Sequence, residues 1–244
     1  MSKKSGRGVF VLSLDVREES QRLQTQVAQV LRALRRHHIP ATWAFPQPGH
    51  SAIAMQLARE PLVHEAAILG DPSWVGEQVG RTTFARELAC RVESAAASGL
   101  HPRTLALQRA ELEDNLDLLV KHRISFVRSA TRPGFRPRSL RFGVWQAPVS
   151  FSLPAENRWS FGGQEWAIGR ALTRASKSHD IVHVVVDLQR LGQHNQTAAL
   201  ERVLTGVQRR QSKGIIAALT LSGVADLLAP RSRPAAARSV LHAA

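Results

Sequence analysis

The chain has 244 residues, 43% of them hydrophobic, which is enough to bury the core of a single α/β barrel. Its 33 Lys and Arg against 19 Asp and Glu give a formal charge of +14, which favours acidic partners such as nucleic acid, anionic glycans or membrane surfaces without choosing among them. A single cysteine excludes a disulfide framework, and no apolar run reaches signal-peptide or membrane-spanning length, so we expect a soluble cytoplasmic protein.

The two ends of the chain have the composition of flexible tails. Residues 1–8 are basic, and residues 230–244 are rich in Arg, Pro and Ala, so neither segment is expected to form a packed element. Between them we expect one domain, residues 9–229.

Short apolar runs alternate with stretches of helical periodicity along this domain. The first pair is a strand over residues 9–15 and a helix over residues 18–36, whose apolar positions recur every three or four residues. Further strands are predicted over 41–45, 64–70, 104–107, 124–127, 144–151, 181–188 and 214–221, and further helices over 53–59, 82–97, 110–121, 164–176, 197–210 and 222–228. We expect Cys90 to be buried on the apolar face of the helix over 82–97. Strands followed by helices pair in parallel, so the pattern predicts a wound sheet or a closed barrel.

In parallel α/β folds the active face is built where the strands end. The residues at these exits are mostly polar: Asp15, Phe45 to Gln47, Gly70 to Asp71, Gln108 to Arg109, Arg128, Asp187 and Thr220. Any one of them could be polar only because it meets solvent. Taken as a set, they indicate one face of the domain as the candidate site.

Several segments carry a resemblance to a known family. IPATWAF, followed by Gly49 and His50, resembles the second strand of the polysaccharide deacetylase (NodB-homology) family, and HEAAILG occupies the place of that family's metal-binding strand. The segments TLALQRAELEDNLDLLVKHRISFVRS and IVHVVVDLQRL resemble later segments of a subgroup. The resemblance implies a single distorted (β/α)7-8 barrel and a metal-dependent enzyme, usually a zinc enzyme, that removes acetyl groups from N-acetylated sugars.

The resemblance carries over only part of the family's machinery. Asp15 matches the catalytic base, but Val16 stands at the position of a metal-ligand aspartate, and the positions of the two metal histidines fall near Leu69 and Ser73. Deacetylation of this kind needs a metal to polarise the amide carbonyl and to activate water. We therefore predict that no metal cofactor is bound.

Two later motifs are also partly retained. The arginine of the family's FPRN motif is kept as Arg109, and His183 matches the earlier histidine of the last motif. Asp187, however, stands where the general-acid histidine would be. Asp15 and Arg109 could form a structural ion pair at the barrel mouth.

The segment over residues 69–81 replaces the family's metal-binding motif. Trp74 could stack on a ligand ring or fill the space of the lost metal site, and the second role is the commoner one for tryptophan. Arg81 could bind an anion or pair with Asp71 or Asp15. Trp43, with apolar neighbours on both sides, is predicted to lie in the core.

Our leading hypothesis is a deacetylase-like protein that is catalytically inactive and whose remodelled pocket binds a glycan, an anionic metabolite or a protein. The candidate ligand-binding residues are Gln47, His50, Asp71, Trp74, Arg81, Arg128 and His183. A first alternative is an active hydrolase with an unorthodox site at Asp15, Arg109 and Asp187. A second is a nucleic-acid or other polyanion binder that uses the tails and an exposed loop from Arg128 to Arg141; it ranks lower because the sequence shows no interleaving of aromatic and basic residues.

Overall fold

The computed structural model describes residues 8–108, 112, 114–153, 163–178, 180–191 and 196–229. Its strands are β1 (Gly8–Asp15), β2 (Thr42–Phe45), β3 (Glu65–Leu69), β4 (Thr104–Ala106), β5 (Phe126–Pro133), β6 (Arg138–Ser139), β7 (Trp145–Val149), β8 (Phe151–Leu153), β9 (Ile181–Asp187) and β10 (Ile216–Leu219). Its helices are α1 (Gln21–His37), α2 (Ala52–Leu57), α3 (Arg81–Ala97), α4 (Leu116–Lys121), α5 (Gly163–Ser178), α6 (Leu188–Leu191), α7 (Gln196–Ser212) and α8 (Leu221–Leu228), with 3-10 turns η1 (Pro48–His50) and η2 (Arg141–Gly143).

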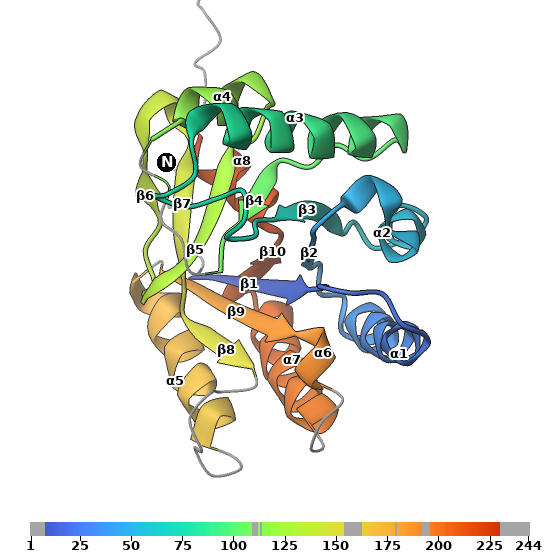
Figure 1. Ribbon diagram of the computed structural model, residues 1–244. Coiled ribbons are helices and arrows are strands. Elements are labelled where there is room, and N and C mark those ends of the chain that lie inside the picture. Colours follow the sequence, from blue (N-terminus) through green and yellow to red (C-terminus); the bar gives the residue numbers. More distant parts are fainter. Residues whose placement is uncertain are drawn as a thin grey trace, which may run out of the picture.

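The strands form one curled sheet in the order β6-β7-β5-β4-β3-β2-β1-β9-β8, with β10 also paired to β1. All these pairs are parallel except β6 with β7. Only Ser150 separates β7, which pairs with β5, from β8, which pairs with β9, so one stretch of chain connects the two sides of the sheet. Ser150 N donates to His183 O at 2.9 Å at this crossing. The predicted distorted (β/α)7-8 barrel is confirmed (Figure 1).

The pleat of β1 separates the core into an outer and an inner part. Phe10, Leu12 and Leu14 face outward and pack in one cluster with apolar residues of α1, α5 and α7. In Figure 1, α5, α6 and α7 gather beside β8 and β9, and α1 lies beside the end of β1. The alternate residues of β1 face the barrel interior, because successive side chains of a strand point to opposite sides. Asp15 is the last of these inward residues.

The amino-terminal end of the barrel is closed by α8. Leu221, Val224 and Ala225 of this helix pack against Val9 and Phe126 inside the sheet. This packing leaves the carboxyl ends of the strands as the end at which a site can form.

A buried carboxylate fastens α8 in place. Glu65 accepts hydrogen bonds from Thr42 Oγ1 at 2.9 Å, from Thr104 Oγ1 at 2.5 Å and from Ser222 N at 2.9 Å. Burial raises the pKa of Glu65, and these donors oppose the rise. The network joins β2, β3, β4 and the start of α8.

Three details differ from the sequence prediction. Cys90 is exposed, whereas we expected it to be buried. The predicted helix over 110–121 is shorter in the described residues: it begins at Leu116, after Asn115 in a left-handed conformation with φ of 63°. Residues 128–141 are not one exposed loop, because β5 continues to Pro133 and β6 follows.

Within the described residues, no helix combines the length and apolar character needed to cross a membrane. The cytoplasmic location stays a prediction. The predicted tails lie outside the described residues, except for Gly8 at the start of β1.

Candidate functional site

A buried ion pair occupies the barrel interior near the carboxyl ends of the strands. Arg128 Nη1 donates to Asp15 Oδ1 at 2.6 Å, and Arg128 Nη2 donates to Asp15 Oδ2 at 2.9 Å. The two side chains are only 1% and 6% exposed. Both carboxylate oxygens of the residue that matches the family's catalytic base are therefore held by one guanidinium group.

His183 lies in the same interior, and both of its ring nitrogens are engaged. Nδ1 lies 3.1 Å from Pro148 O, which can only accept, so Nδ1 carries the proton and Nε2 accepts from Ser13 Oγ at 2.8 Å. Burial, with a smaller contribution from the charge of Arg128, lowers the pKa of His183 to about 3. The ring is neutral at physiological pH and has no free nitrogen for a metal or a substrate.

Asp187 lies next to Asp15 on the neighbouring strand, as its register partner in the β1–β9 ladder. Its Oδ1 accepts from the backbone N of Gln189 at 3.0 Å and of Arg190 at 3.4 Å, so it caps the short helix α6. Its Oδ2 lies 3.4 Å from Arg17 Nη2. Asp187, which stands at the position of the general-acid histidine, thus caps α6 and lies beside Arg17 and Arg190.

The residues at the remaining metal-ligand positions do not fit a divalent cation. Val16 is buried in the outer core and Leu69 packs in an apolar cluster of alanines, while Ser73 is exposed and its backbone N binds Asp71 Oδ1 at 2.9 Å. Within the described ranges, no three His, Cys, Asp or Glu side chains come together as a metal-binding group. Divalent metals of this family's type need several such ligands around one point.

The side chain of Trp74, in the segment that replaces the metal-binding motif, packs in the protein interior. It is 2% exposed, and its ring stacks on Phe84 with centroids 6.0 Å apart and an interplanar angle of 20°. The guanidinium of Arg91 lies over the Trp74 ring, with Cζ 4.3 Å from the ring centre. Trp74 therefore packs in the core, as does Trp43, which is fully buried.

The sequence suggested that Arg81 pairs with Asp71 or Asp15, but in the structure it has other partners. It donates to Asp117 at 2.5 and 3.0 Å and to Asn115 at 2.8 Å, because α3 places it beside the start of α4. This pair is exposed and joins two helices outside the barrel.

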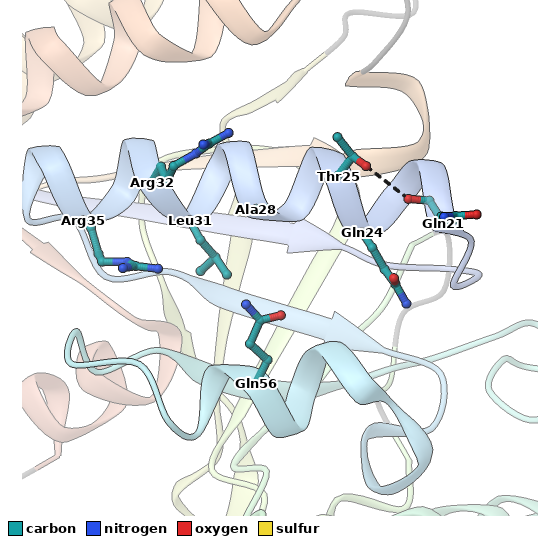
Figure 2. Close-up of a pocket in the computed structure, with 8 residues that line it drawn as sticks. All are labelled: Gln21, Gln24, Thr25, Ala28, Leu31, Arg32, Arg35 and Gln56. Carbon is teal, nitrogen blue, oxygen red and sulfur yellow. Dashed lines mark hydrogen bonds between the residues drawn. The ribbon is translucent and has the colours of Figure 1, made fainter.

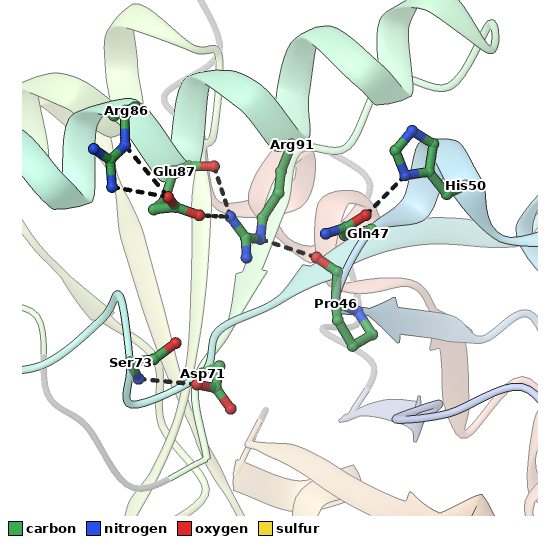
Figure 3. A network of polar contacts seen from close by, with 8 residues as sticks. All are labelled: Pro46, Gln47, His50, Asp71, Ser73, Arg86, Glu87 and Arg91. Atoms are coloured by element: carbon green, nitrogen blue, oxygen red, sulfur yellow. Dashed lines mark hydrogen bonds and ion pairs between the residues drawn. The ribbon is translucent and has the colours of Figure 1, made fainter.

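Arg91 organises the mouth next to Trp74, and the sequence analysis did not single it out. Its Nε donates to Pro46 O at 3.0 Å and its Nη1 donates to Glu87 Oε2 at 2.7 Å, so the end of β2 is tied to α3 (Figure 3). No local signal marks this residue, because an arginine on a polar helix face usually points to solvent. Its role depends on where β2 ends relative to α3.

Three predicted ligand-binding residues form an exposed rim at the mouth. The Gln47 amide oxygen and His50 Nδ1 lie 2.7 Å apart, and Asp71 accepts a hydrogen bond from the backbone N of Ser73 in its own turn (Figure 3). Hydrogen bonds from Ser73 lower the pKa of Asp71. These side chains keep polar atoms available to solvent, so their predicted role in ligand binding stays a prediction.

The predicted Arg-rich surface is largely paired. Arg136 Nε binds Asp180 Oδ1 at 3.0 Å, Arg138 Nε donates to Gln146, and Arg128 is the buried partner of Asp15. Arg109, the expected partner of Asp15, lies outside the described residues. The predicted Asp15–Arg109 pair therefore stays a prediction, while Arg128 engages both oxygens of Asp15.

A separate hollow lies on the outer surface between α1 and α2, away from this mouth (Figure 2). It is lined by the polar residues Gln21, Gln24, Arg32, Arg35 and Gln56 together with Thr25, Ala28 and Leu31. None of the predicted site residues contributes to it.

No protein-family model matches the chain, and no curated protein does either. Solved structures do match over almost all of its length. A polysaccharide deacetylase from Mycobacterium smegmatis, assigned that activity provisionally, superposes with a TM-score of 0.70 and 16% sequence identity, over 93% of this chain and 92% of the other. The fold is that of the polysaccharide deacetylases.

Two further structures show the range of proteins that share this deacetylase fold. A mutant of BA3943, a CE4 family pseudoenzyme, matches with a TM-score of 0.54 and 11% identity, over 91% of this chain and 68% of the other. A 4-alpha-glucanotransferase from Thermococcus litoralis matches with a TM-score of 0.65 and 10% identity, over 92% of this chain and 41% of the other. At such identities the likeness shows the fold and not the activity.

Proposed function

We propose that this chain is a divergent NodB-homology protein that has lost deacetylase chemistry and uses its barrel as a binding domain. The bidentate pairing of Arg128 with Asp15 carries the proposal. A catalytic base must reach the water that it activates. Asp15 has both oxygens occupied and is almost completely buried.

The other steps of the family's reaction also lack their residues. His183 is neutral with both nitrogens engaged, and Asp187 caps α6. The metal-ligand positions hold Val16, Leu69 and Ser73, and we propose that the mouth binds no divalent metal. The similarity to a CE4 family pseudoenzyme is consistent with this loss on the same fold.

The exposed rim residues Gln47, His50 and Asp71 are the groups that we assign to ligand binding. Amide, imidazole and carboxylate groups at the mouth of a barrel fit the hydroxyl and acetamido groups of a glycan. The glycan is therefore the ligand to test first, before an anionic metabolite or a protein.

The test for activity uses the full chain with chitotetraose and added zinc, followed by acetate assay and metal analysis. We expect no acetate above a protein-free blank and less than one zinc per chain. Stoichiometric zinc together with acetate release that Asp15→Asn abolishes, in a variant that remains folded by circular dichroism, would show an active enzyme.

The test for binding is calorimetric titration with the same chitotetraose. We expect the double variant Gln47→Ala, Asp71→Ala to weaken binding at least fivefold. The matched control is Gln24→Ala, Gln56→Ala, which removes polar groups from the outer hollow of Figure 2 and should leave the affinity unchanged. Equal affinity in both variants would place glycan binding elsewhere.

An active hydrolase built on Asp15, Arg109 and Asp187 has less support. Arg109 lies outside the described residues. Asp15 and Asp187 are register neighbours, which satisfies one requirement of a shared site. However, arginines engage both carboxylates, and Asp187 also bonds the backbone of α6. Both oxygens of Asp15 are hydrogen-bonded to Arg128, and Asp187 Oδ2 lies within ion-pair distance of Arg17, so neither carboxylate resembles an unengaged general base.

A further inference from the structure

Helix α5 carries an aromatic and basic stripe on its outer face. Trp166, Arg170, Arg174 and Lys177 follow one another at intervals of four, four and three residues, so they lie along one side of the helix. All four are exposed, and Trp166 is 64% exposed. One exposed aromatic ring and three basic side chains therefore share a helix face, although they are not adjacent in the sequence.

A fifth residue, Arg210 of α7, extends this stripe. Its Nη2 donates to Gly169 O and to Thr173 Oγ1, each at 3.2 Å, and its Nη1 donates to Gly206 O at 3.0 Å. All of these acceptors are neutral, so the guanidinium is fixed in position and none of these contacts neutralises its charge. Trp166, Gly169, Arg170, Thr173, Arg174, Lys177 and Arg210 line an open surface hollow of about 620 Å³. We call these residues the α5 face.

Nearby carboxylates are already paired with other arginines. Arg202 holds Glu165 through two contacts of 2.7 Å, and Arg136 holds Asp180. Burial opposes the lowering of the Asp180 pKa, hydrogen bonds from Ser178 and Arg136 lower it, and the charge of Arg174 acts through space in the same direction. In the part of the chain that the structure describes, Arg170, Arg174 and Lys177 form no ion pair.

Ring contacts hold two of these arginines. Arg170 Cζ lies 4.7 Å from the centre of the Trp166 ring, and Arg174 Cζ lies 4.2 Å from that of Phe135. These contacts already restrict the two arginine side chains, so a bound ligand would pay a smaller entropy cost to order them. Because Trp166 remains 64% exposed, part of its ring surface is open to a second stacked group.

We propose that the α5 face binds single-stranded nucleic acid, with phosphates on Arg170, Arg174, Lys177 and Arg210 and a base stacked on Trp166. A nucleic-acid strand carries a negative charge and a flat base in every nucleotide, which matches a row of cations that begins at an exposed aromatic ring. A guanidinium group can also donate two parallel hydrogen bonds to the oxygens of one phosphate. This surface lies on the outer helices, so the proposal is independent of the one for the barrel mouth.

The test is fluorescence anisotropy of a labelled 15-nucleotide oligo-dT with the full chain over a range of NaCl concentrations. We expect Arg170→Ala, Arg174→Ala, Lys177→Ala to weaken binding at least tenfold. The slope of log affinity against log salt should fall by about 2, from three lost contacts to a single strand. Trp166→Ala should weaken binding by about tenfold through lost stacking.

The matched control is Arg22→Ala, Arg32→Ala, Arg59→Ala, which also removes three positive charges, but from exposed positions on α1 and after α2. It should change the affinity less than threefold. The proposal is overturned if the control weakens binding as much as the α5 variant, or if the wild-type chain does not bind the oligonucleotide. Tighter binding to a heparin hexasaccharide, to vesicles containing phosphatidylserine or to duplex DNA of the same length would also overturn it.

Discussion

Arg128 and Asp15 meet across the barrel interior from strands that are separated in the sheet by β4, β3 and β2. The contact forms because the sheet curls, so that an inward residue of β5 faces an inward residue of β1. It thus joins positions 113 residues apart in the chain. The pair is both the strongest argument against deacetylase chemistry and a test of the fold.

We expect Asp15→Asn to lower the free energy of unfolding by about 3–5 kcal/mol, because it leaves the buried guanidinium of Arg128 without its counter-charge. Urea unfolding followed by circular dichroism measures this loss. The double variant Asp15→Leu, Arg128→Met should be more stable than Asp15→Asn, because it removes both charges and keeps apolar volume.

The exposed pair of Arg81 with Asp117 supplies the control. Arg81→Ala should leave the urea midpoint nearly unchanged, because solvent screens an exposed ion pair. If Asp15→Asn were as mild as Arg81→Ala, the buried pair would not exist as described.

His183 makes the stability of the protein depend on pH. Its folded pKa of about 3 lies below the ordinary value of 6.5, so between these values the unfolded chain binds more protons than the folded chain. Stability therefore rises with pH through this window and is lost as pH falls below 6.5. From pH 7 to pH 5.5, a single such histidine should cost about 1 kcal/mol.

His183→Gln should reduce this loss by about that amount, as measured by urea midpoints at the two pH values. His64, whose pKa burial lowers to about 4, contributes with the same sign in both proteins. Glu65, whose pKa burial raises, contributes with the opposite sign in both. An unchanged pH dependence in His183→Gln would mean that the imidazole is accessible to protons in the folded state.

Sequence patterns predicted the barrel well, because local periodicity and the inward and outward alternation of the strands depend on near neighbours. They predicted the site less well, because its contacts form between distant strands. Nothing near Arg128 distinguishes a buried partner of Asp15 from an arginine in an exposed loop. Arg128 and Asp15 come within contact distance only when the sheet curls and brings β5 opposite β1.

Helical spacing accounts for the exposure of Cys90 and for the α5 face. The buried residues of α3 include Phe84 and Leu88, four residues apart, and Cys90 lies two residues further on, a spacing that puts it on another side of the helix. The same rule places Trp166 and Arg170 of α5 together. A comparison of adjacent residues does not show the α5 face, because its members are three or four residues apart in the sequence and become neighbours only on the helix.

Close packing around Gly49 leaves no room for a side chain, which can be tested. A Cβ atom at Gly49 would lie 2.3 Å from Ser94 O, since α3 packs directly on η1, and backbone cannot move aside cheaply. Gly49→Ala should therefore destabilise the protein by about 1–3 kcal/mol through overpacking. Gly169→Ala is the control: nothing lies within 4 Å of a Cβ there, so alanine in α5 should be neutral or stabilising. Equal effects of the two changes in thermal unfolding would contradict the close approach of α3.

Trp74 distinguishes a barrel that is packed at the former metal-binding segment from one that is open to a ligand. Its ring contacts Phe84 and Arg91, and its indole Nε1 has no acceptor in the described residues, so shape and not hydrogen bonding holds it. Trp74→Phe should then cost less than about 1.5 kcal/mol, and Trp74→Ala about 3–5 kcal/mol through the cavity it leaves. Both are read from urea unfolding, and the chitotetraose affinity of the Phe variant should equal that of the wild type. A Trp74→Ala variant that keeps its stability but loses chitotetraose binding would instead make Trp74 a ligand contact, because a side chain that stacks on a sugar adds little to the core of the free protein.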